Sequence, residues 1–158
     1  MFSLTKVLTF FHVLCAIVGF GWVLLVGIQF KRAGELKGSE GAELYGTAHK
    51  ITKVATIFIY LTGAFGLAAA LTMDGEPFKQ MWLSISMAVY IVALVLSLAV
   101  MQPAARKLTR LYPEALESGN AAITAEIDAT NKRTAAVSGI LDLLFVVMLF
   151  LMIFKWPN

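Results

Sequence analysis

Four long apolar stretches alternate with polar segments along this chain of 158 residues. Each stretch is mostly apolar and 20–27 residues long, and as a helix rising roughly 1.5 Å per residue it can cross a hydrocarbon core of about 30 Å. We therefore predict four membrane-spanning helices, at residues 4–30, 50–73, 80–102 and 135–154. The expected fold is all-α: an antiparallel four-helix transmembrane bundle of up-down-up-down order, forming a single integral membrane domain over residues 1–158.

Two polar segments, residues 31–49 and 103–134, are expected to be the long loops of this bundle. The first is Gly-rich and predicts a helix end, a turn and a short helical lead-in. In the second, Tyr112-Pro113-Glu114 predicts a break in the helix. Ser118 or Asn120 then caps a helix that we expect to continue into the last span.

Composition and charge agree with a membrane protein. The chain is 59% hydrophobic and 15% charged, whereas a soluble domain is nearer 45–50% apolar. Ten of the 13 Lys and Arg residues lie in residues 31–53 and 103–134. This asymmetry predicts that both long loops are cytoplasmic and that both termini lie on the outer face of the membrane. The basic residues flank apolar runs instead of forming a strip with aromatic residues, so no nucleic-acid partner is predicted.

His12 is the ionisable residue that lies well inside the first apolar stretch. An ionisable side chain in a span is costly, so it is expected to have a function or a partner. The structural interpretation is a hydrogen bond to a neighbouring helix. The functional interpretation is an axial ligand of haem b, because imidazole is a common haem ligand. Gly19, at i+7 on the same helix face, would give a flat group clearance.

Met87 and Met148 are expected near the depth of His12 and are the candidate sixth ligands of such a haem. Methionine thioether binds haem iron in some cytochromes, although methionine more often fills gaps in a core. His49 is expected to be solvated at the end of the second span. It lies roughly 18 Å from the level of His12 by helical rise and therefore cannot share one haem with it.

Two further side chains in the spans carry chemistry. Asp142 is expected to be a hydrogen-bonded clamp between helices, with Lys53, Thr56 and Tyr60 as candidate partners, or a proton relay. Cys15 is expected to be a small buried hydrophobe. Because it is the single cysteine, it allows no internal disulfide.

Several motifs carry a resemblance to known families. They are His12-Val13-Leu14 with Gly19 and Gly21, Trp82-Leu83-Ser84, residues 102–108, residues 139–144 and residues 151–155. Over nearly its whole length the chain resembles a family of predicted bacterial four-span membrane proteins of unassigned function. That family is distantly similar to CopD-type copper-resistance domains and HemJ-type protoporphyrinogen oxidases, whose first span also carries a histidine. The similarity implies that His12 is the haem-ligand position. The Asn-Glu-Pro-type segment of HemJ-type proteins is absent, so porphyrinogen oxidation is not implied.

Three functions follow as hypotheses. The first is a haem-b protein that passes electrons between a membrane quinol, the reduced form of a quinone, and an acceptor at the outer face. The second is a non-catalytic accessory subunit that contacts membrane protein partners or forms a homo-oligomer. The third is a metal-handling or transport domain that uses His12 and Asp142. The sequence holds no phosphate loop, paired carboxylates or Ser/His/Asp arrangement, so whether the chain is an enzyme stays open. Membrane lipid is the partner common to all three.

Overall fold

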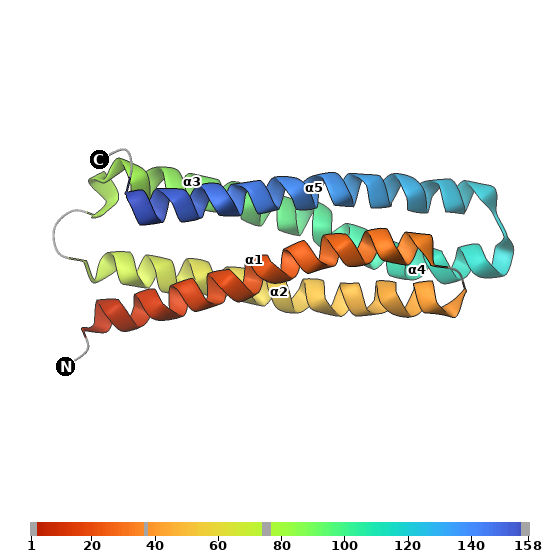
Figure 1. The fold of residues 1–158 in the computed structure, drawn as a ribbon, viewed down its shortest axis with the longest axis horizontal. Coiled ribbons are helices and arrows are strands. Elements are labelled where there is room, and N and C mark those ends of the chain that lie inside the picture. Colours follow the sequence, from red (N-terminus) through yellow and green to blue (C-terminus); the bar gives the residue numbers. More distant parts are fainter. Residues whose placement is uncertain (1–2, 37, 74–76, 156–158) are drawn as a thin grey trace.

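All regular structure in the described residues, 3–36, 38–73 and 77–155, is helical in this computed structural model (Figure 1). The elements in order are α1 (Leu4–Glu35), α2 (Ser39–Leu71), the 3₁₀ turn η1 (Pro77–Lys79), α3 (Met81–Leu96), the π-helical turn η2 (Ser97–Met101), α4 (Gln102–Ser118) and α5 (Ala121–Phe154). α3, η2 and α4 follow one another directly and form one rod, Met81–Ser118, which we call the α3–α4 rod.

The helices run up, down, up and down, with both chain ends at the same end of the molecule (Figure 1). α1 packs against α2 and α5, and the α3–α4 rod packs against α5 and α2. Four helices, with the rod counted as one, are long and apolar enough to cross a membrane. The predicted four-helix transmembrane bundle is confirmed.

Most apolar side chains of the four spans point outward. Only 22–33% of the residues in the apolar window of each span are buried inside the bundle. In water such a surface would be unstable, whereas in a bilayer it meets lipid tails of similar polarity. The interior contacts therefore come from a narrow strip on each helix, rich in small residues such as Gly19, Ala55 and Ala93.

The helices are longer than a bilayer core requires. α5 has 34 residues, equivalent to about 50 Å, against a hydrocarbon thickness of about 30 Å. The excess lies at the end that carries the α1–α2 and α4–α5 turns, which we call the polar end. Its interior is packed, because Phe30, Ala33, Tyr45 and Leu108 are each at most 1% exposed. The segments expected as long loops are therefore mostly helix, which these buried contacts stabilise.

The predicted break at Tyr112-Pro113-Glu114 is wrong, because α4 passes through Pro113 and ends at Ser118. A proline inside a helix costs about 3 kcal/mol in isolation. Tyr112 compensates here, since its side chain is buried and its hydroxyl donates to the Leu36 carbonyl oxygen at 2.7 Å. Tertiary contacts therefore keep this segment helical despite the local preference.

The predicted start of the last helix is confirmed. Gly119 ends α4 with a φ of 59°, a left-handed conformation that glycine adopts readily. Asn120 is the N-cap of α5, and its Oδ1 accepts a hydrogen bond from the Ala122 backbone nitrogen at 2.9 Å. From there α5 continues without interruption into the fourth span.

Candidate functional site

His12 lies in the seam between α1 and α2 and is half-buried. Its Nδ1 lies 2.8 Å from the carbonyl oxygen of Thr62 on α2. The ring occupies space that a side chain at position 66 would need, because a Cβ on Gly66 would lie 2.7 Å from His12 Nδ1. Gly66 therefore allows the imidazole to approach the α2 backbone.

The hydrogen bond to Thr62 determines which nitrogen of His12 is available. A carbonyl oxygen only accepts, so Nδ1 carries the proton. In the neutral ring the lone pair is then on Nε2, which has no hydrogen-bond partner in the described part of the chain. Metal-ligating histidines are commonly oriented by this kind of bond from the non-ligating nitrogen. His12 thus combines the expected interhelical hydrogen bond with a second ring nitrogen that has no partner among the described residues.

A second aromatic ring contacts α2 in the same way one turn along. The hydroxyl of Tyr90, on α3, donates to the Ile59 carbonyl oxygen at 2.9 Å. A Cβ on Gly63 would clash with the Tyr90 ring and hydroxyl. Gly63 and Gly66 therefore leave two adjoining spaces on the surface of α2. The Tyr90 ring from α3 fills the space at Gly63, and the His12 ring from α1 fills the space at Gly66.

The other predicted haem-site residues, Gly19, Met87 and Met148, lie on three different helices. Gly19 is buried against α2, where an added Cβ would lie 3.1 Å from the Ile59 backbone nitrogen. Met148, on α5, is 5% exposed and belongs to the main apolar core. Met87, on α3, is 39% exposed. Gly19 thus serves the contact between α1 and α2, and the ligand roles of the two methionines stay predictions.

Asp142 is half-buried on α5, and the described residues offer it no hydrogen bond or ion pair. Its predicted pairing with Lys53, Thr56 or Tyr60 is not found. The reason is the packing order, because α2, which carries these three residues, packs mainly against α1 and the α3–α4 rod. Cys15, by contrast, is 5% exposed, which confirms the expected buried hydrophobe.

His49, on the polar half of α2, is not the solvated side chain that the sequence suggested. It is half-buried, and its Nδ1 lies buried without a hydrogen-bond partner among the described residues. The described residues contain no group of three or more His, Cys, Asp or Glu that could hold a metal ion. His12 contacts α2 at Thr62, which is about 20 Å by helical rise from His49 on the same helix, so the two histidines are separate features.

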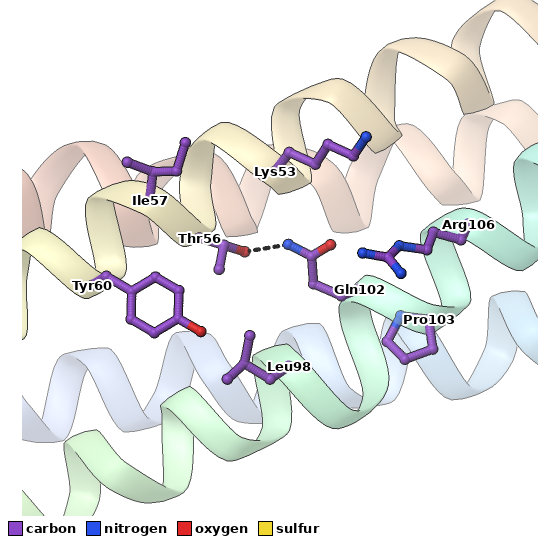
Figure 2. Close-up of a pocket in the computed structure, with 8 residues that line it drawn as sticks. All are labelled: Lys53, Thr56, Ile57, Tyr60, Leu98, Gln102, Pro103 and Arg106. Atoms are coloured by element: carbon purple, nitrogen blue, oxygen red, sulfur yellow. Dashed lines mark hydrogen bonds between the residues drawn. The ribbon is translucent and has the colours of Figure 1, made fainter.

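An open groove lies between α2 and the α3–α4 rod, with a volume of about 650 Å³ (Figure 2). It spans the junction between the apolar spans and the polar end. The residues that line it are Lys53, Thr56, Ile57, Tyr60, Leu98, Gln102, Pro103 and Arg106. The π-helical turn η2 directly precedes Gln102, and such turns are frequent at functional sites.

The orientation of the Gln102 amide follows from its partner. The Thr56 hydroxyl gives its single hydrogen to the Thr52 carbonyl oxygen at 2.8 Å, so the hydroxyl oxygen can only accept from Gln102. Gln102 therefore presents Nε2 to Thr56, at 2.8 Å. Its Oε1 is left buried without a donor in the described part of the chain. An unpaired buried acceptor is unusual enough to call for an explanation.

Sequence reasoning did not single out this groove. The available signal was Gln102-Pro103 at the foot of an apolar span, with a cation one turn later at Arg106. Lys53 stands at the matching boundary of the second span. Because basic residues at span ends are common, the pattern could not show that the two cations face one cavity.

Comparison with known proteins gives one family match. The family described as "Predicted integral membrane protein (DUF2269)" matches residues 6–156 of the chain. No curated protein and no solved structure matches it.

Proposed function

The chain belongs to this family of predicted integral membrane proteins, and on that premise we propose that it is a small haem-b-binding protein with a redox or electron-transfer role. In this proposal His12 would hold the haem iron through Nε2. Haem would supply the one-electron chemistry, and a membrane quinone is the proposed redox partner. The similarity to CopD-type and HemJ-type proteins belongs to the same proposal.

The proposal rests on the hydrogen bond that orients the His12 ring. Its Nδ1 is engaged by the Thr62 carbonyl oxygen at 2.8 Å, so the ring is oriented and Nε2 has the lone pair. Neutral imidazole oriented in this way is the donor that haem iron accepts in proteins. The chemistry of the donor therefore fits the group. An apolar setting also favours a bound porphyrin, whose ring is largely hydrophobic.

The other predicted haem-site residues differ in how well their positions support this proposal. Met148 is the better candidate for a second ligand, because it is buried in the core that α1 and α5 share. Met87 would have to turn inward, since it is 39% exposed. Gly19 already contacts Ile59, so its packing gives no support to a role in clearance for the ring.

The visible absorption spectrum tests the proposal. The full chain, expressed in haem-replete cells and purified in detergent, is expected to show a Soret band that shifts on reduction with dithionite. His12→Ala is expected to remove most of this band because it deletes the ligand. His49→Ala is the matched control and is expected to keep it, since His49 lies on the polar half of α2.

A variant that misfolds would also lose the band, so a second measurement is needed. Exogenous imidazole, added to His12→Gly, is expected to restore the Soret band by entering the vacated space. A colourless wild-type protein from haem-replete cells would contradict the proposal. A Soret band of equal intensity in wild type and His12→Ala would contradict the assignment of the ligand.

A further inference from the structure

We propose that the groove between α2 and the α3–α4 rod binds a phosphate-bearing anion through Lys53 and Arg106. This site lies toward the polar end and is separate from His12, so it does not depend on haem. The phosphate could belong to a lipid headgroup or to a free anion. The chemistry of recognition is the same for both sources.

Uncompensated positive charge is the first observation. Lys53 extends from α2 and Arg106 from α4, and both line the cavity of about 650 Å³ (Figure 2). Neither has a carboxylate partner among the described residues. Lys107, the next residue on α4, does have one, since its Nζ lies 2.6 Å from Glu126 Oε1. Two unpaired cations at one cavity attract an anion, and arginine with lysine is a common phosphate-binding set.

The unpaired oxygen of Gln102 is the second observation. Figure 2 shows the Arg106 guanidinium extending toward Gln102, whose Oε1 is buried without a donor. A guanidinium has five N–H donors in a fixed plane. Arg106 can therefore donate one hydrogen bond to Gln102 Oε1 and keep a pair for two phosphate oxygens. In this arrangement Gln102 positions Arg106 and does not itself bind the anion.

The shape of the groove suggests how an amphiphile would lie in it. Ile57, Tyr60 and Leu98 line the part toward the spans, whereas Lys53 and Arg106 line the part toward the polar end (Figure 2). A phospholipid at this depth would place its phosphate between the cations and an acyl chain along the apolar part. Basic pockets between membrane helices bind anionic lipid headgroups in this way.

Binding measurements on the full chain in detergent test the proposal. The groove variant is Lys53→Gln with Arg106→Gln. The matched control is Lys50→Gln with Arg110→Gln, which removes equal charge from exposed positions on the same two helices outside the groove. The probes are dioleoyl-phosphatidylglycerol, a phosphate-free galactolipid with the same chains, and sodium phosphate against sodium chloride at equal ionic strength. Native mass spectrometry measures lipid binding, and calorimetry measures phosphate binding.

The groove variant is expected to bind a phosphate-bearing probe at least about tenfold more weakly than the wild type and the control variant. If the source is a lipid, phosphatidylglycerol shows this loss and millimolar phosphate does not compete. If the source is free phosphate, phosphate shows the loss by itself. Equal binding of phosphatidylglycerol and of phosphate by the groove and control variants overturns the proposal. A wild type that binds the galactolipid as tightly as phosphatidylglycerol and does not bind free phosphate overturns it as well. Melting temperatures of both variants within a few degrees of the wild type exclude misfolding as the cause.

Discussion

At the scale of single residues, glycines on one helix decide how polar rings from other helices are held. His12 and Tyr90 each bond a backbone carbonyl of α2, and each occupies the space above a glycine. In an apolar environment an unpaired imidazole or phenol is costly, so both polar atoms need such partners. The sequence indicated that His12 requires a partner, whereas only the structure shows that this partner is the Thr62 carbonyl oxygen on α2.

Gly66→Ala is expected to destabilise the protein by about 1–3 kcal/mol, the usual cost of overpacking. The new Cβ would lie 2.7 Å from His12 Nδ1 and would displace the ring from the Thr62 carbonyl oxygen. Gly21→Ala is the control, because no atom lies within 4 Å of its added Cβ. Gly21→Ala is expected to change the free energy of unfolding by less than about 0.5 kcal/mol, or to raise it. Chemical unfolding in mixed micelles measures the stability of both variants. An equal loss of stability in the two would show that Gly66 is not needed to make room for the His12 ring.

At the scale of elements, the helices are joined by side chains that reach neighbouring backbones. The Tyr112 hydroxyl on α4 donates to the carbonyl oxygen of Leu36, the C-cap residue that follows α1, and thereby satisfies one of the free carbonyls at that terminus. Gln102 joins the rod to α2 through Thr56. These contacts explain why α4 tolerates Pro113, since ending the helix there would remove the anchor of Tyr112.

Tyr112→Phe is expected to lower the free energy of unfolding by about 0.5–1.5 kcal/mol, because it removes one hydrogen bond and keeps the ring. Tyr60→Phe is the matched control. The Tyr60 hydroxyl has no hydrogen-bond partner in the described residues, so its loss is expected to cost less than about 0.5 kcal/mol. Unfolding in detergent compares them. A larger effect for Tyr60→Phe would show that the α4–α1 contact is not what stabilises this end.

At the scale of the whole molecule, the bundle has an apolar part and a polar end with a continuous core. Lys and Arg residues concentrate at the polar end, where ten of the 13 lie in residues 31–53 and 103–134. The positive-inside rule therefore still predicts a cytoplasmic polar end, with both termini on the other side.

Labelling of introduced cysteines in intact bacterial cells tests this orientation. Ser3→Cys lies at the end with the termini, and Ala125→Cys lies on an exposed position of the polar end. A membrane-impermeant maleimide is expected to label Ser3→Cys directly and Ala125→Cys only after permeabilisation. The native Cys15 is 5% exposed and serves as an unlabelled background. The reverse labelling pattern would contradict the predicted orientation.

Short-range patterns in the sequence were enough to predict the spans, the start of α5 and the importance of His12. The apolar stretches predicted four spans because a bilayer core sets their length, and Asn120 predicted the start of α5 because side-chain caps act within a few residues. His12 was likewise visible, since an ionisable residue in an apolar run stands out in sequence. Each of these inferences depends only on neighbours along the chain.

Only the tertiary structure decided which helix faces meet. In the structure α2 packs against α1 and the α3–α4 rod, so Asp142 on α5 does not meet its predicted partners on α2. The same packing places Lys53 and Arg106 at one groove. It also kept α4 helical through Pro113. The physical reason is that lipid tails and apolar side chains are equally nonpolar, so hydropathy cannot tell a face that meets lipid from one that meets a helix. That choice depends on close contacts at glycines and on single hydrogen bonds between residues far apart in the sequence.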